Sequence, residues 1–289
     1  MLRGQCKVIV QTQWAGEACD AMVALHARRS AASIAAYRQR HPRGPLAVML
    51  TGTDLYRDLP GSREAAASLD TADRIVVLQE DAQRLLAPPW RSKSVVIFQS
   101  ARPLAPARKS RERLRCVVVG HLRDEKDPAT LFAAMGRLPA GIPATIRHIG
   151  SPLDERLAAQ ARALEKRDPR YRYVGALHHG LTRCAIRNAH LLVHPSIMEG
   201  GANVIVEAVM SGTAVVASRV SGNVGMLGSG YPGYFEVGDA SGLAAQLVSA
   251  WEDRPYLRSL ERACAARRSL FRPETEARSV KRLLRAMLA

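Results

Sequence analysis

Two glutamates stand on either side of a glycine pair and a helix start in the stretch "PSIMEGGANVIVEAVMSGTAVVAS" (195–218). Glu199 precedes the glycines, and Glu207 lies about one turn inside a helix expected to begin near Asn203. The unpaired N–H groups of a helix N-terminus favour an anion, and a carboxylate can accept two hydrogen bonds from a vicinal diol. The pattern fits a binding site for a hydroxylated, phosphorylated ligand. A glutamate that favours the helix dipole, beside a solvated one, also fits.

A second group of candidate residues lies in "VVVGHLRDEKDP" (117–128), where a buried apolar strand is expected to end at Gly120. His121, Arg123 and Lys126 follow, and basic groups after a strand end can hold a diphosphate. An ordinary charged loop is the alternative. The sequence contains no GxGxxG, so a dinucleotide-binding domain is not expected.

Polar side chains also follow two strands expected in the first third of the chain. Because ligands of parallel sheets bind at the carboxyl ends of the strands, these residues are candidates for a second binding site. A structural histidine, a solvated helix start and a turn-capping aspartate are the alternative interpretations. The residues are His26, Arg28 and Arg29 after one strand, and Thr51, Thr53, Asp54 and Arg57 after the next.

The elements that must position these residues alternate between apolar strand-like runs and helical patterns. Such continuous runs indicate parallel strands buried on both faces. Before residue 100, strands are expected at 6–12, 21–27, 46–52, 74–79 and 94–99, and helices at 28–40 and 62–70.

The segment 100–115 is rich in charge and proline and predicts a hinge between two domains. After it, Ser241 is a candidate N-cap for the helix at 240–252. Strands are expected at 116–120, 144–150, 171–175, 191–196, 213–218 and 233–237, and helices at 128–137, 153–167, 180–189, 203–211, 240–252, 256–270 and 274–288.

The pattern predicts an α/β protein of two Rossmann-like, doubly wound parallel-sheet domains that face each other across a cleft. The expected domains are 1–105 and 106–272, with 273–289 a C-terminal helix that packs back toward the first. The N-terminal domain is expected to be truncated, because the chain opens with "MLRGQ" (1–5), which reads as the end of a helix, and lacks a first strand, Gly-rich turn and helix of about 30 residues.

Composition narrows the class of protein. Forty-two Lys and Arg against 26 Asp and Glu give a net charge of +16, which suits a solvated basic surface or a site for phosphorylated small molecules. Aromatic residues make up 5% of the chain, so the basic–aromatic pattern of nucleic-acid binding is absent. Five scattered cysteines without CxxC, no membrane-length apolar run and no signal peptide predict a cytoplasmic protein.

Together, the Gly120 turn, its basic residues and two glutamates separated by seven residues resemble the donor half of the GT-B glycosyltransferases, retaining family 4 in particular. The resemblance covers 116–252 and extends more weakly over 6–100. It implies that Glu199 contacts the donor sugar and Glu207 the ribose. Lys126 matches the family's phosphate-binding lysine, whereas His121 replaces its arginine and Arg123 can compensate.

The resemblance thus implies a donor-binding set and a catalytic pair. His26 matches the position of an active-site histidine in many family 4 enzymes, and the N–H groups of residues 201–203 complete the phosphate grip. The donor-binding set is Gly120, His121, Arg123, Lys126, Gly200, Gly201, Ala202, Asn203 and Glu207, and the catalytic pair is His26 and Glu199.

"MLTGTDLYRDL" (49–59), together with the two motifs above, is similar to a group of small family 4-like enzymes assigned as selenosugar synthases of selenoneine biosynthesis. These join selenophosphate to the sugar of a UDP-sugar such as UDP-N-acetylglucosamine and release UDP. Selenophosphate is a small polyanion, so Arg28, Arg29, Arg57 and the polar residues near them become its expected binding residues.

The resemblance implies two small-molecule substrates, a UDP-sugar and selenophosphate, with no metal, no other cofactor and no nucleic acid. Membrane association is not expected, and the sequence does not define an oligomeric state. Two alternatives stay open. One is a family 4 enzyme that glycosylates an oxygen acceptor for a surface polysaccharide, with the basic helices at 256–288 on anionic lipid. The other is a non-catalytic nucleotide-sugar or nucleic-acid binding module.

Overall fold

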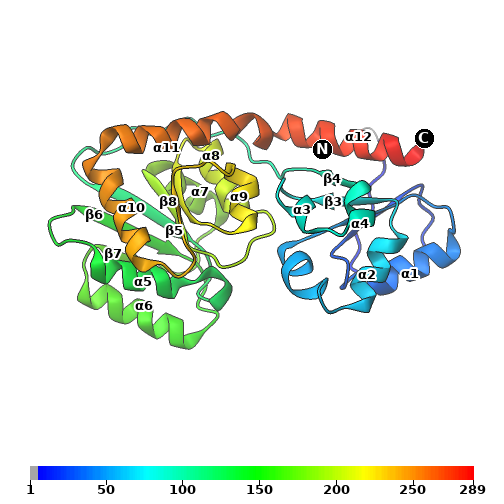
Figure 1. Ribbon diagram of the computed structural model, residues 1–289, viewed down its shortest axis with the longest axis horizontal. Coiled ribbons are helices and arrows are strands. Elements are labelled where there is room, and N and C mark those ends of the chain that lie inside the picture. The colour runs from blue at the N-terminus through cyan, green and yellow to red at the C-terminus, as the bar shows by residue number, and fades with distance from the viewer. Residues whose placement is uncertain (1–5) are drawn as a thin grey trace. The chain divides into compact units, whose positions relative to one another are not determined.

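The computed structural model describes residues 6–289; the helix end expected at residues 1–5 lies outside the described part. Contacts between Cα atoms divide the chain into two compact units. Unit 1 comprises 1–100, 199–201 and 270–289, and unit 2 comprises 101–198 and 202–269. Figure 1 labels the elements of both units.

Unit 1 contains a four-stranded parallel sheet with the order β1-β2-β3-β4. Its strands are short β-branched and apolar runs, and Leu46, Val48 and Ile75 are fully buried in the core. The strands are β1 (Met22–Leu25), β2 (Leu46–Met49), β3 (Arg74–Val77) and β4 (Ser94–Val96). The helices of this unit are α1 (Ala31–Arg40), α2 (Arg63–Thr71), α3 (Ala82–Leu85), α4 (Pro88–Ser92) and α12 (Pro273–Leu288), with a π-helical turn at Asp54–Asp58.

The C-terminal helix α12 belongs to unit 1, far from it in sequence but close in space (Figure 1). Leu283 of α12 is buried in a cluster with Ala47, Val76 and Ile97 of the sheet region. Ser100 Oγ donates a hydrogen bond to Glu276 Oε2 at 2.5 Å. An apolar stripe on an otherwise charged helix therefore covers one face of the sheet.

The strand expected at 6–12 does not form, so this prediction is wrong. Residues 6–12 have no strand conformation, and Val8, Ile9 and Val10 are 56%, 51% and 89% exposed. A β-branched run becomes a strand only where a neighbouring strand pairs with it and buries one face. In the described part of unit 1, β2 pairs with β1, and no strand pairs with the other edge of β1.

Unit 2 contains a six-stranded parallel sheet with the order β10-β9-β8-β5-β6-β7. The chain winds outward from β5 through β7, returns to β8 and winds in the other direction to β10, as in a doubly wound domain. Its strands are β5 (Leu114–Val119), β6 (Ala144–Ile149), β7 (Tyr171–Tyr173), β8 (Leu191–His194), β9 (Ala214–Ser218) and β10 (Tyr234–Phe235).

The helices of unit 2 begin mostly at acidic N-caps. The carboxylates of Asp127, Asp154 and Asp239 accept hydrogen bonds from backbone N–H groups in the first turns of α5, α6 and α10, as N-cap side chains do. The N-cap expected at Ser241 is therefore wrong, because Asp239 fills that role two residues earlier. The helices are α5 (Pro128–Arg137), α6 (Glu155–Arg167), α7 (His179–Asn188), α8 (Asn203–Met210), α9 (Ser221–Leu227), α10 (Ala240–Glu252) and α11 (Arg254–Arg267).

Candidate functional site

The two donor motifs follow neighbouring strands in unit 2. β5 and β8 are paired, with Cys116 opposite Leu191 and Val117 opposite Leu192. The direction of winding reverses between these two strands, and ligands of doubly wound sheets bind beyond the carboxyl ends at such a point. The N–H of Ile197, after β8, donates to the carbonyl of Glu125 at 3.1 Å, so the loops after the two strands touch.

The turn after β5 is held by β6. Gly120 N–H donates to Ile149 O at 2.9 Å. A Cβ on Gly150 would overlap the Gly120 carbonyl and lie 2.9 Å from the Cα of His121, so the close approach requires glycine at 150. The Gly120 turn is therefore shaped by backbone packing as well as by its own sequence.

His148 of β6 also holds this turn, and the sequence did not single it out. Its Nε2 lies 3.2 Å from Gly120 O, and its Nδ1 lies 2.8 Å from Tyr171 Oη. Because a carbonyl only accepts, Nε2 carries the proton, and the tyrosine hydroxyl donates to Nδ1. Burial lowers the pKa of His148 to about 4, so the ring is neutral at pH 7. The alternation "ATIRHIG" was the available signal, because it places this residue on a buried strand.

Among the basic residues of the turn, His121 and Lys126 lie close to Gly120. The Lys126 stem is 3.4 Å from where a Gly120 Cβ would lie, and His121 Nδ1 accepts from Ser151 N–H at 3.0 Å. Burial, and then the charges of Arg123 and Lys126, lower the pKa of His121. Arg123 Nε lies 3.9 Å from Glu125 Oε2, and its side chain is half exposed.

Helix α8 begins at Asn203 as expected, with Ala202 at the N-cap. No side-chain hydrogen bond of the described residues caps this N-terminus, so its first N–H groups are free of that competition. Glu207 is 5% exposed, and His179 Nε2 lies 2.6 Å from its Oε1. His179, the first residue of α7, was not among the predicted residues, because "LHHG" has no spacing signal toward Glu207.

The segment Glu199–Gly201 groups with unit 1, where it lies against the loop after β2. A Cβ on Gly200 would overlap the backbone nitrogen of Gly52, and a Cβ on Gly201 would lie 2.6 Å from Leu78 Cβ. Glycine is thus needed at 200 for a close approach to the backbone of Gly52, and at 201 for contact with the Leu78 side chain. Glu199 itself is half-buried.

His26 is the centre of the candidate residues in unit 1. It is 6% exposed and has a positive φ of 75°, a strained conformation for a non-glycine residue that surrounding contacts must hold. Its Nδ1 lies 2.7 Å from Asp54 Oδ1, and its Nε2 lies 3.0 Å from Thr53 Oγ1 and 3.5 Å from Asp58 Oδ2. Asp58 was not predicted; its signal was the position four residues after Asp54.

Asp54 joins the ends of two strands. Its oxygens accept from the N–H of Ala27 at 2.9 Å, the N–H of Thr51 at 2.7 Å and the Thr51 hydroxyl at 3.0 Å. Burial raises the pKa of Asp54, opposed by these hydrogen bonds and by His26. The structure thus brings together His26, Thr51, Thr53 and Asp54.

The three arginines predicted beside them are more exposed. Arg28 Nη1 lies 3.1 Å from Asp58 Oδ1, although its side chain is 57% exposed, and Arg29 and Arg57 are exposed. His26, Asp54 and Asp58 offer atoms within 4.8 Å of one another, as a metal site requires. The hydrogen bonds to Asp54 and the Arg28–Asp58 ion pair fit a hydrogen-bonded network better than a cation, because they already use these carboxylates.

The fold and the switch-point site define an α/β protein of the GT-B type, which confirms the expected fold class. The chain belongs to the group 1 glycosyl transferases: the family model "Glycosyl transferases group 1" matches residues 105–267, which confirms the broader part of the resemblance. No helix among the described residues is long and apolar enough to cross a membrane.

Solved structures with the same fold share little sequence. Anabaena HepE, solved in complex with UDP and glucose, is 18% identical over 92% of this chain and 77% of that one, with a TM-score of 0.73. Sucrose-phosphate synthase from Thermosynechococcus elongatus is 21% identical over 92% and 73%, with a TM-score of 0.74. The UDP-forming trehalose-phosphate synthase from Burkholderia xenovorans, with glucose-6-phosphate, is 13% identical over 93% and 75%, with a TM-score of 0.74. A search of curated proteins found no match.

Proposed function

We propose that this protein transfers a sugar, N-acetylglucosamine, from a UDP-sugar to selenophosphate. One observation carries the donor half of the proposal: the Gly120 turn and the loop before α8 follow the two strands at the switch point of unit 2 and are joined by the Ile197–Glu125 hydrogen bond. The choice of UDP as the nucleotide is supported by similar folds that were solved in complex with UDP. The selenium acceptor rests on the resemblance of "MLTGTDLYRDL" and "MEGGAN" to selenosugar synthases.

The proposed chemistry is positioning and charge stabilisation. A lone pair of selenium forms the bond to the anomeric carbon, and the bond from that carbon to the diphosphate oxygen breaks, so its electron pair leaves with UDP. Lys126, Arg123 and the N–H groups at the start of α8 balance the charge that develops on UDP. Glu207 accepts hydrogen bonds from the ribose hydroxyls, and Glu199 contacts the sugar that is transferred. The proposal uses no metal, because these groups supply the positive charge.

In unit 1 the acceptor assignment rests on charge and on the His26 network. Arg28, Arg29 and Arg57 offer exposed guanidinium groups that suit a polyanion such as selenophosphate. Thr51 and Thr53 supply hydroxyl groups next to His26.

A second candidate, a family 4 glycosyltransferase that acts on an oxygen acceptor for a surface polysaccharide, is favoured by the His26–Asp54 pair. A histidine whose Nδ1 is 2.7 Å from a buried carboxylate is the arrangement that removes a proton from a hydroxyl. Selenium is a strong nucleophile and needs no such base.

The test is mass spectrometry after anaerobic incubation with UDP-N-acetylglucosamine and selenophosphate. The proposal expects a sugar with the isotope pattern of selenium and an equal amount of UDP. Glu207→Gln should lower kcat/KM about ten- to a hundred-fold, since charge-assisted hydrogen bonds are worth about 1.5–3 kcal/mol. Glu252→Gln, an exposed glutamate at the end of α10, is the matched control.

The other outcomes separate the alternatives. UDP release with a glycosylated hydroxyl acceptor and no selenium product supports the second candidate and refutes the first. UDP binding without turnover on either acceptor refutes both and leaves a non-catalytic binding module.

A further inference from the structure

Unit 2 contains a basic pocket at the edge of its sheet opposite to the candidate donor site. The segment 109–111 precedes β5, His190 precedes β8, and Gly212 lies just before β9. Lys109 Nζ donates to Gly212 O at 2.8 Å. Because all strands of this sheet are parallel, the residues before them gather at the amino edge, whereas the donor motifs follow the same strands at the carboxyl edge.

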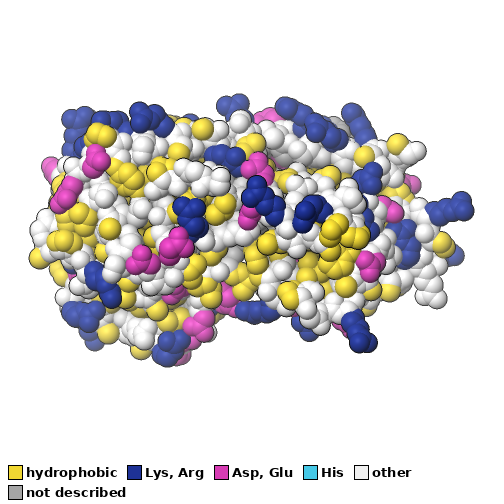
Figure 2. All heavy atoms as spheres, viewed as in Figure 1, with side chains coloured by type: hydrophobic (Ala, Val, Ile, Leu, Met, Phe, Trp, Pro, Cys, Tyr) yellow, Lys and Arg dark blue, Asp and Glu magenta, His cyan; other side chains and the backbone are white. Residues whose placement is uncertain are grey.

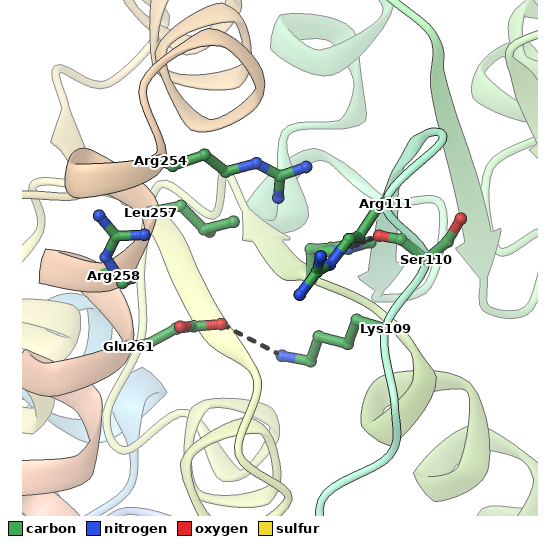
Figure 3. Close-up of a pocket in the computed structure, with 8 residues that line it drawn as sticks. Lys109, Ser110, Arg111, Arg254, Leu257, Arg258 and Glu261 are labelled. Carbon is green, nitrogen blue, oxygen red and sulfur yellow. Dashed lines mark hydrogen bonds and ion pairs between the residues drawn. The ribbon is translucent and has the colours of Figure 1, made fainter.

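The lining of this pocket is strongly cationic. Its volume is about 500 Å³, within the range of small-molecule sites. Figure 3 shows Arg254 of α11 and Arg111 and Lys109 of the segment before β5 pointing into the space from two sides. Arg258 also lines the pocket, and Glu261 supplies its carboxylate, 3.8 Å from Lys109 Nζ. The lining therefore contains four cationic side chains and one carboxylate.

Two of these four cationic side chains have no polar partner inside the described part of the protein. Among the described residues, no ion pair or hydrogen bond engages the guanidinium of Arg111 or Arg258, and that of Arg254 lies over the Trp251 ring at 5.5 Å. In Figure 2, Lys and Arg side chains gather over the first part of α11. Guanidinium groups without partners in a concave site suit the oxygens of a phosphate group.

The pocket is also held in shape before any ligand binds. His190 is 3% exposed; its Nδ1 accepts from Arg115 N–H at 3.0 Å, and its Nε2 lies 2.8 Å from Ser110 O. Since Nδ1 accepts, Nε2 carries the proton and donates, so the neutral ring clamps both ends of the segment that carries Arg111. Burial lowers the pKa of Lys109, opposed by Glu261, and an added anion would favour its charged form.

We propose that this pocket binds the phosphate group of a phosphorylated small molecule, at a site separate from the donor site. The ligand is held by Arg111 from the segment before β5 and by Arg254 and Arg258 from α11. It therefore ties that segment to the helix. Leu257, which is 4% exposed, offers an apolar surface to the rest of the ligand.

Pyrophosphate is the probe, with hydrogen exchange of the intact chain as the local measurement. We expect protection of peptides that cover 109–115 and 254–261. Peptides over 117–128 and 195–207 report separately on the donor site, so the result does not depend on the proposed function. Absence of protection at 109–115 and 254–261 overturns the proposal.

Calorimetry of three variants gives the second measurement. Arg111→Gln and Arg254→Gln should each weaken pyrophosphate binding at this site about ten-fold, the loss of one charge-assisted contact. Arg111 lies outside any helix, so its variant keeps the test valid if α11 is disturbed in the other. Arg262→Gln, an exposed arginine of α11 outside the pocket, is the matched control. An equal loss in Arg262→Gln, or none in Arg111→Gln, overturns the proposal.

Vesicles of phosphatidylglycerol distinguish a lipid headgroup from a soluble phosphate. The proposal expects pyrophosphate to bind and Arg111→Gln to leave sedimentation with vesicles unchanged. If vesicle binding requires Arg111 while pyrophosphate gives no protection, the ligand is a membrane surface, and the small-molecule site is refuted.

Discussion

His148 lies on strand β6 of unit 2, between β5 and β7, and its replacement by glutamine should remove a large part of the protein's sensitivity to acid. The side chain is 1% exposed, and burial lowers its pKa from an ordinary 6.5 to about 4. Since the unfolded chain takes up this proton near pH 6.5 and the folded chain only near pH 4, stability present above pH 6.5 is lost as the pH falls toward 4. At 1.36 kcal/mol per pH unit, the interval corresponds to about 3 kcal/mol.

The assay is urea unfolding followed by circular dichroism between pH 7 and pH 4.5. His148→Gln loses the ring and its hydrogen bond to Gly120, so we expect it to be about 2 kcal/mol less stable at pH 7. The difference from the unaltered protein should shrink as the pH falls. His121 and His190, whose pKa values burial also lowers, are present in both proteins and cancel in the comparison.

A matched variant separates titration from packing. Tyr171→Phe removes the hydroxyl that donates to His148 Nδ1 at 2.8 Å but keeps the aromatic ring and the histidine. It should be less stable at pH 7 and retain an acid-dependent loss. If the unaltered protein and His148→Gln lose stability in parallel from pH 7 to pH 4.5, the account of a neutral buried imidazole is refuted.

Three further changes test other contacts. Arg170→Gln should lower the free energy of unfolding by about 1 kcal/mol at pH 7. The hydrogen bond from Arg170 lowers the pKa of Asp168, so this stability is lost as the pH falls below about 4. Parallel pH profiles of the variant and the unaltered protein in urea unfolding would contradict this account. His179→Ala frees the Glu207 carboxylate from its 2.6 Å contact with His179 Nε2. Because the His179 side chain is 70% exposed, calorimetry should show UDP binding at most about five-fold tighter. Weaker binding of UDP would instead make His179 a positioning residue. Leu283→Ala should cost about 2–4 kcal/mol and speed amide exchange along α12; unchanged exchange would show that α12 does not depend on this contact.

The sequence predicted most elements of unit 2 because its strands are continuous apolar runs between capped helices. Helix α5 was expected at 128–137, and it spans Pro128–Arg137. The short α9 was missed, since "SGNVGML" has too few turns for a helical period. The strand at 6–12 had the right composition and failed for lack of a pairing partner, which no local pattern reveals.

The sequence predicted candidate residues that stand at a fixed spacing from one another, but it did not predict the side chains that contact them. Glu207 was visible from its spacing to Glu199, but His179 is 28 positions away in sequence. Asp58 lies 32 positions from His26. Such pairs depend on which strands become neighbours, and a single sequence leaves that open.

The net charge of +16 was consistent with a solvated surface or with a phosphate site, and the arrangement in unit 2 favours a combination of the two. Exposed arginines such as Arg262 of α11 are solvated. Arg111 and Arg254, in contrast, converge on a concave space at the amino edge of the sheet, although like charges repel and gain nothing from being gathered. The repulsion between these arginines lowers the stability of the folded state, and a bound anion would offset it. Binding of a phosphate in the pocket should therefore raise the free energy of unfolding of unit 2.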